Sequence, residues 1–90
     1  MKKCIWKYVL ETTDQQTIDI PSTFQILTAQ MLHGALCLWT VVDAKSPKRT
    51  ISLSVYTTDE LIPENPGEYI TTFQVGQGSL VFHLFWKPVD

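Results

Sequence analysis

The chain has 90 residues, of which 44% are hydrophobic and 18% are charged, and its formal net charge is −2. This length predicts a single domain, 1–90, with a thin core, because so short a chain buries only about 60% of the surface that it exposes when unfolded. The negative charge does not favour nucleic-acid binding, which needs a basic face to neutralise phosphates. Apolar runs stay well below the roughly 20 residues that a transmembrane helix needs, so we expect no membrane segment.

The first residues, MKKCIWKYVLETT, resemble a signal peptide because two lysines precede an apolar run. Lys7 interrupts that run, however, and no cleavage site with small residues follows it. We therefore expect the protein to stay in the cytoplasm, where thiols remain reduced and Cys4 and Cys37 are free.

Apolar and polar residues alternate with a period of two along most of the chain, and β-branched and aromatic residues dominate the apolar positions. This pattern is typical of β-strands. We predict seven strands, at residues 4–11, 17–20, 24–32, 35–43, 50–57, 68–75 and 80–87. Helix propensity alone would also permit a helix over 23–32. We favour a strand there, because the following segment mirrors it across a short bend.

That bend is His33-Gly34, in the segment QMLHGALCLW. Glycine adopts positive φ without penalty and histidine does so more often than most residues, which suits a two-residue hairpin loop. The predicted core face of this hairpin pairs Met31 with Leu36, Ala29 with Leu38 and Leu27 with Thr40. The predicted outer face is mixed and pairs Gln30 with Cys37, Thr28 with Trp39 and Ile26 with Val41.

The basic residues of the loop AKSPKR, which are Lys45, Lys48 and Arg49, are interpreted as solvated charges on a turn. The stretch DELIPENPG, 59–67, holds two prolines and a glycine, which exclude a regular element. Its acids and the one that follows are interpreted as a solvated acidic loop; these are Asp59, Glu60, Glu64 and Glu68.

A second hairpin is predicted around the four-residue loop 76–79. Its core face pairs Val75 with Leu80, Phe73 with Phe82, Thr71 with Leu84 and Tyr69 with Trp86. Its outer face pairs Gln74 with Val81, Thr72 with His83 and Ile70 with Phe85.

Both hairpins thus carry apolar residues on two faces, whereas a sheet open to water on one side alternates more cleanly. The sequence therefore predicts an all-β fold, a small antiparallel sandwich or barrel of about seven strands. The alternative is a sheet whose outer face is covered by a second copy of the chain. We accordingly expect self-association as a homodimer or a higher oligomer.

The chemistry-bearing residues do not form a recognisable set. His33 lies at a hairpin tip and His83 within a strand, neither cysteine is in a metal-binding spacing, and the loop GQGS lacks the lysine and helix of a phosphate-binding loop. We therefore predict no catalytic residues, no metal and no cofactor, and a protein that is not an enzyme.

Trp39 is the residue of most interest, because it falls on the mixed face beside Thr28. Tryptophan and tyrosine are enriched at binding hot spots, since they bury a large area with few torsions to fix. Trp39 is either part of such a surface or packed inside the second layer of a sandwich.

The segments ILTAQMLHGALCLWTVVD, VYTTDELIPENPGEYITTFQ and GSLVFHLFW resemble a family of short bacterial and phage proteins of unassigned function. Members of that family read I-L-x-x-Q, L-W-x-x-V-D, a segment like Y-G-T-G-H, Y-I-G-T and L-V-W-H-V-F. The resemblance covers 25–85, and its matching residues are Gln30, Leu38, Trp39, Asp43, Tyr56, Tyr69, Ile70, Thr72 and His83. The chain has Tyr-Thr-Thr-Asp-Glu at 56–60 instead of Y-G-T-G-H, which argues against an anion site on those amides.

The resemblance implies a phage or prophage origin and supplies no activity. The function expected from the sequence is a non-enzymatic, phage-encoded binding protein that inhibits a host defence system or sequesters a small signalling molecule. The partner, a host protein or a small molecule, is not readable from the sequence. The alternative is a structural or assembly accessory of the phage particle. The residues expected to bind are Trp39, Thr28, Gln30, Tyr56 and His83.

Overall fold

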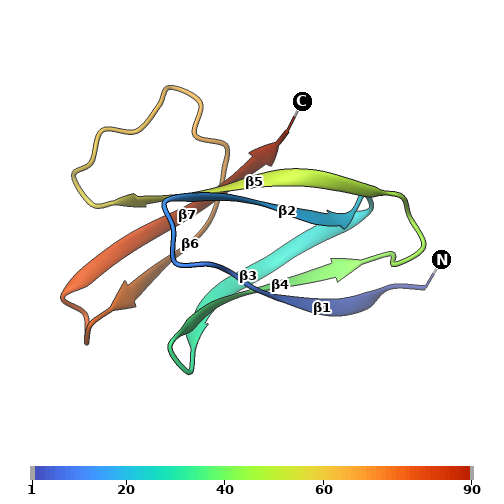
Figure 1. Cartoon of the computed structure of the whole chain (residues 1–90), viewed down its shortest axis with the longest axis horizontal. Coiled ribbons are helices and arrows are strands. Elements are labelled where there is room, and N and C mark those ends of the chain that lie inside the picture. The colour runs from blue at the N-terminus through green and yellow to red at the C-terminus, as the bar shows by residue number, and fades with distance from the viewer. Residues whose placement is uncertain (1, 90) are drawn as a thin grey trace.

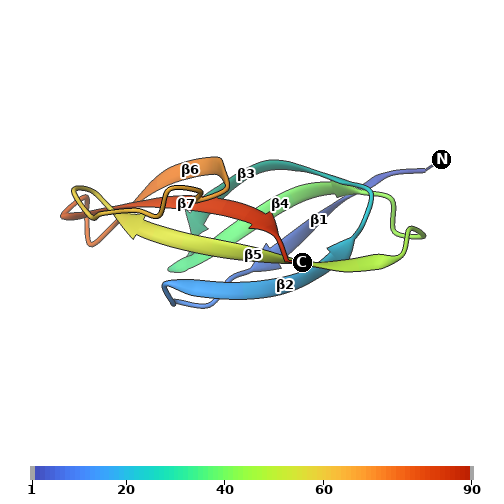
Figure 2. The same ribbon diagram turned by 90° about the horizontal axis from the view of Figure 1, so that it is seen from above.

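The computed structural model describes residues 2–89 as seven strands in two antiparallel sheets (Figure 1). The strands are β1 (Cys4–Val9), β2 (Gln15–Pro21), β3 (Phe24–Leu32), β4 (Ala35–Val42), β5 (Lys48–Thr57), β6 (Glu68–Val75) and β7 (Leu80–Pro88). Sheet A has the order β1-β4-β3 and sheet B the order β2-β5-β7-β6. The sheets pack face to face without closing into a barrel (Figure 2), so the predicted all-β fold is confirmed, as a sandwich.

Between residues 2 and 89 there is no helix, and hence none long and apolar enough to cross a membrane.

Three strands extend further than predicted, β2, β5 and β7, the last by one residue, whereas β1 and β4 end earlier, at Val9 and Val42. β2 begins at Gln15 because Gln15 and Gln16 continue the ladder with Ser54 and Leu53 of β5. β5 begins at Lys48, which was predicted to lie in the loop with Arg49. Lys48 and Arg49 continue the ladder with Pro21 and Ile20 of β2. The Lys48 ammonium lies 5.8 Å from the Trp6 ring centre, and the Arg49 guanidinium lies 6.0 Å from the Phe24 ring centre.

The two-residue bend between β3 and β4 is confirmed. His33 has φ 50° and Gly34 has φ 83°, and Leu32 pairs with Ala35 directly across them. A type I′ turn requires positive φ at both central residues. This turn is common in two-residue hairpins because its twist matches the twist of the flanking strands. His33 is exposed at the tip and supplies the first of the two positive φ angles.

Replacing His33 with asparagine is expected to change the free energy of unfolding by less than about 0.5 kcal/mol, because asparagine also tolerates positive φ. Urea unfolding of the two proteins measures this difference. A loss of more than about 1 kcal/mol would show that the imidazole makes a contact that the turn geometry does not account for.

Each hairpin contains a β-bulge that the sequence did not reveal. In β3 the extra residue is Leu27, so Ile26 rather than Leu27 lies opposite Thr40, and Gln25 rather than Ile26 lies opposite Val41. Leu27 is consequently 46% exposed instead of forming part of the core. An extra residue in one strand reverses the face of the residues beyond it, because side chains alternate with a period of two.

The bulge in β6 has the larger consequence for function. The extra residue is Ile70, so Glu68 rather than Tyr69 lies opposite Trp86, and Tyr69 rather than Ile70 lies opposite Phe85. Ile70 packs against the core, and Tyr69 turns to the outer face of sheet B, where it is 58% exposed.

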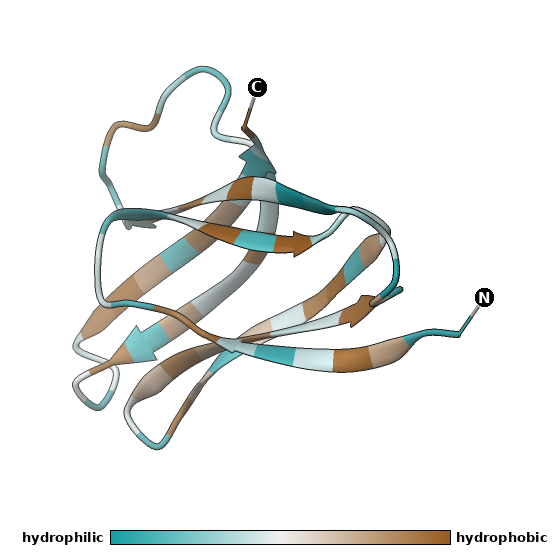
Figure 3. Cartoon of the chain, turned by 45° about the vertical axis from the view of Figure 1, so that its right-hand side comes forward, coloured by the Kyte–Doolittle hydropathy of each residue, from teal (hydrophilic) through white to brown (hydrophobic). Residues whose placement is uncertain are grey.

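The core lies between the sheets and is built from the central strands β4, β5 and β7 with contributions from their neighbours (Figure 3). Its fully buried side chains include Ile20, Leu38, Val42, Ile51, Leu53 and Leu84. Trp86 packs against this cluster, as predicted, and so does Trp6. Trp39 lies on the outer face of sheet A, opposite Lys7, and not inside the sandwich.

The two cysteines are free, and the pairing of β1 with β4 explains why. Cys4 lies opposite Val42 and Cys37 lies opposite Val9, so the cysteines are separated by five residues along β4. That is about 17 Å at the rise of a strand, well beyond the roughly 7 Å that a disulfide spans.

Tyr8 projects between the sheets, and its buried hydroxyl has no hydrogen-bond partner in the structure. Burial raises the pKa of Tyr8 above its usual value, and the nearby negative charge of Asp19 raises it further. A raised folded pKa means that the neutral phenol is favoured in the folded state. The stability that folding gains from keeping the Tyr8 phenol neutral is therefore fully present below the unfolded pKa of about 10. It is lost as the pH rises through the folded pKa.

Replacing Tyr8 with phenylalanine is expected to raise the free energy of unfolding by about 1 kcal/mol at neutral pH, because the substitution removes an unpaired buried hydroxyl. The variant should also lose less stability between pH 8 and about pH 11 than the parent protein. Urea unfolding at both pH values tests this, and a destabilised variant would mean that the hydroxyl has a partner.

Candidate functional site

The residues that the sequence selected lie on opposite outer faces of the sandwich. Thr28 pairs with Trp39, and Gln30 with Cys37, on the outer face of sheet A. Tyr56 and His83 pair with each other on the outer face of sheet B. The five residues therefore form two separate groups. The second group, Tyr56 and His83, takes part in a network of hydrogen bonds and aromatic contacts.

His83 is the centre of that arrangement, because both of its ring nitrogens are hydrogen-bonded. Thr58 Oγ1 lies 2.9 Å from Nε2, and Thr72 Oγ1 lies 2.9 Å from Nδ1. The Tyr69 hydroxyl continues the chain, 2.8 Å from Thr72 Oγ1. These bonds join β7 to its neighbour β6 and to the loop that follows β5.

Three aromatic rings lie beside this network on the same face. The Phe85 ring packs edge-on against Tyr56 and Tyr69, with ring centres 5.8 Å and 5.7 Å apart. Edge-to-face packing at this spacing is favourable because the positive ring edge meets the negative face. Phe85 is half-buried and contacts both tyrosine rings. We call Tyr56, Tyr69, Thr72, His83 and Phe85 the aromatic face of sheet B.

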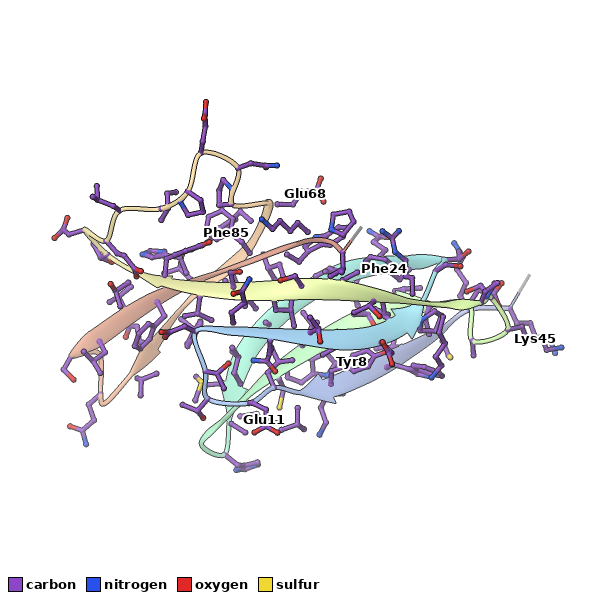
Figure 4. The ribbon with its side chains drawn as sticks, turned by 45° about the horizontal axis from the view of Figure 1, so that its top comes forward. Tyr8, Glu11, Phe24, Lys45, Glu68 and Phe85 are labelled. Carbon is purple, nitrogen blue, oxygen red and sulfur yellow. The ribbon has the colours of Figure 1, made fainter. Side chains whose placement is uncertain are left out.

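The loop 58–67 forms a wall beside the aromatic face and arches away from the sandwich (Figure 1). Its first turn is held by the Glu60 carboxylate, which accepts hydrogen bonds from the Thr57 amide at 2.8 Å and the Thr57 hydroxyl at 3.1 Å. The bond from Thr58 to His83 then ties this turn to the sheet. Figure 4 shows Phe85 and Glu68 below the arch. These bonds fix the start of the loop against the sheet.

Between this loop and the sheet is a shallow cavity of about 220 Å³, open to solvent. Its lining consists of Tyr56, Thr57, Thr58, Asp59, Ile62, Tyr69, His83 and Phe85. A wider opening, of about 670 Å³, lies between β3 and β6 at the two bulges. Tyr69 lines both openings and forms the ridge between them.

Within residues 2–89, the hydrogen bonds that orient His83 come from hydroxyl groups and not from a carboxylate. In nucleophile-activating sets an acid holds the imidazole and stabilises its charged form. Here the two recorded partners of the ring are threonine hydroxyls, which can each donate or accept a hydrogen bond. The network therefore fixes the position of the side chains and suits recognition through shape and hydrogen bonding.

Sequence reasoning missed Tyr69 and Thr58 as members of this site. Tyr69 was placed on the core face because the bulge at Ile70 carries no glycine or proline to mark it. Thr58 lies in the irregular stretch after β5, where periodicity gives no information. Phe85 was placed correctly on the outer face, although without a role.

The chain matches a family model, described as a domain of unknown function (DUF7352), over residues 1–90. It belongs to that family. No curated protein and no solved structure gives a significant match to it. Membership in a family of unassigned function agrees with the resemblance seen in the sequence, and the description of the family carries no activity.

Proposed function

We propose that this protein is a non-enzymatic, phage-encoded binding protein that uses the aromatic face of sheet B to engage a host protein, such as a component of a defence system. The observation that carries the proposal is the exposed but fixed side chain of Tyr69. Its side chain is 58% exposed, yet it is held by Phe85 on one side and by Thr72 on the other. An exposed aromatic that is already ordered loses little entropy on binding, which is the property of a hot-spot residue.

The lining of the small cavity favours a protein over a signalling nucleotide as the target. Its charged member is Asp59, and a phosphate-bearing ligand needs positive charge or converging amides. Exposed apolar side chains extend the contact area beyond the cavity, since Leu61 is 96% exposed and Ile62 is 48% exposed. A surface of this kind, with aromatic residues at its centre, is typical of protein interfaces.

The charges around the aromatic face indicate the chemistry of the partner. Asp59, Glu60, Glu64 and Glu68 are all exposed and lie along the loop and at the start of β6. They outnumber the basic residues at the edges of this face, which are Lys87 on β7 and Arg49 beside the wider opening. Complementary potentials steer association and depend on ionic strength. The partner surface should therefore combine an apolar centre with a basic rim, and its association rate should fall as salt is added.

Affinity purification from bacterial lysate tests the proposal, with the protein, a Tyr69→Ser variant and a Leu32→Ser variant as baits. Leu32 is a matched control because it is an apolar residue of the other sheet that is 38% exposed at the end of β3. The proposal predicts a bacterial protein that the parent and the Leu32→Ser bait enrich and the Tyr69→Ser bait does not. Equal enrichment by all three baits, or no enriched protein, would contradict it.

We also propose that the outer face of sheet A joins two copies of the chain. Ile5 and Val9 of β1 are both 63% exposed there, beside the half-buried Trp39 and Val41 of β4. These four apolar side chains surround Lys7, whose charged end can reach water while its stem covers the patch. Large contiguous apolar patches are rare on the surfaces of monomers. A two-fold pairing would cover the same patch on both copies, and it would leave the aromatic face of sheet B free for its partner.

A further inference from the structure

A third cavity, of about 320 Å³, opens between the sheets at the end where the two hairpin tips lie. It lies on the inner face of sheet B, whereas the aromatic face lies on the outer face, so it is separate from the site described above. Its apolar lining comes from both sheets and comprises Met31, Leu36, Val55, Phe73, Val75, Leu80 and Phe82.

The walls of this cavity continue the core. Met31, Val55 and Phe73 pack against the buried cluster, and Phe73 stacks on Phe82 with ring centres 5.5 Å apart. Protein interiors are normally close-packed, with few voids larger than a water molecule. An apolar opening of this size is at the lower end of the range for ligand pockets, which suits a short alkyl chain or a single ring.

The rim of the cavity is acidic and ordered. Glu11 and Asp14, with Thr12 and Thr13 between them, come from the turn that joins β1 to β2. Gln16 holds this turn through two 3.0 Å bonds to the Glu11 backbone, and the Val55 amide donates to the Asp14 carbonyl at 2.9 Å. Figure 4 shows Glu11 at the same end of the sandwich as the tip of the β3–β4 hairpin.

The lining contains two carboxylates and neither a lysine nor an arginine among residues 2–89. A ligand whose apolar part fills the cavity would place its polar end beside Glu11 and Asp14. An anionic end would be repelled there, whereas a cationic end would be attracted. We propose that this cavity binds a small amphiphilic cation, with a hydrocarbon body inside the sandwich and a positively charged nitrogen at the acidic rim.

Titration with octylammonium and octanoate, followed by NMR below the concentrations at which either forms micelles, tests the proposal. The two probes share a chain length and differ in the sign of the head-group charge. Octylammonium should shift the signals of Met31, Val55 and Phe82, and octanoate should bind at least about tenfold more weakly because its carboxylate faces like charges. Octanoate binding equal to or tighter than octylammonium, or no binding of either, would overturn the proposal.

Two variants locate the probe. Val75→Phe fills the mouth of the cavity and should abolish octylammonium binding, whereas Val89→Phe adds the same bulk at an exposed position after β7 and should leave binding unchanged. Glu11→Gln with Asp14→Asn should reduce the preference for the cation while octylammonium still enters. Undiminished binding in a folded Val75→Phe variant would place the probe elsewhere and contradict the assignment. None of these readouts depends on a protein partner, so the proposed function and this inference can fail independently.

Discussion

Replacing Gly67 with alanine is expected to lower the free energy of unfolding by about 3 kcal/mol, the largest effect that we expect from removing or adding a single methyl group in this chain. Gly67 has φ 100°, a conformation that residues with a Cβ rarely adopt. A Cβ at this position would also lie 2.3 Å from the Trp86 carbonyl oxygen and 2.8 Å from its carbon. Backbone atoms of a central strand cannot move aside, so β6 would have to shift.

The matched control is Gly34→Ala at the β3–β4 bend. Gly34 has φ 83°, but a Cβ there meets nothing within 4 Å. Its cost is confined to backbone strain and should be about 1–2 kcal/mol. Urea unfolding of both variants measures the difference, and NMR of the Gly67→Ala variant should show displaced Tyr69 and His83 signals. Equal costs at the two positions would mean that β6 tolerates the shift and that Gly67 does not fix the site.

If two copies pair through sheet A as proposed, replacing Trp39 with glutamate is expected to convert the dimer to monomer and to lower the melting temperature. The substitution replaces the largest apolar side chain of the patch, which lies opposite Lys7, with a carboxylate that is costly to remove from water. Burial of apolar area contributes about 25 cal/mol per Å², and a lost kcal/mol lowers the melting temperature of a chain this short by about 4–8 °C. Light scattering and thermal unfolding measure the two changes.

A Thr17→Glu variant is the control for Trp39→Glu, because Thr17 is exposed on β2, the edge strand of sheet B, where it pairs with Ser52. It should keep the parent's oligomeric state. A parent protein that is monomeric at high micromolar concentration would contradict self-association through sheet A. In that case the patch around Trp39 would remain an exposed surface of a monomer.

The strands could be predicted from the sequence because alternation of apolar residues is a local property. The bend at His33-Gly34 and the loop 76–79 followed from turn chemistry and set the register near each tip, where the predicted pairs are observed. The assignment of each strand to one of the two sheets could not be predicted, because it depends on which strands pair: β1 joins β4, and β2 joins β5. These contacts are distant along the chain.

The candidate site could be predicted only in part, for reasons of register. Tyr56 and His83 were selected, and the structure places them side by side. Tyr69 was assigned to the core, because the bulge at Ile70 is made by an ordinary β-branched residue that periodicity alone does not mark. Such a bulge is stabilised by tertiary contacts: Ile70 packs against the core while Tyr69 packs on Phe85. Periodicity therefore predicts a strand more reliably than the face of a residue beyond a bulge.

The most direct test of the proposed binding surface is NMR of the labelled protein with and without the partner captured by affinity purification. The amide signals of Tyr56, Tyr69 and His83 and of the loop 58–67 should change, and those of Ile5 and Val9 in sheet A should not. Changes centred on Trp39 and its neighbours, with the aromatic face of sheet B unaffected, would contradict the proposal.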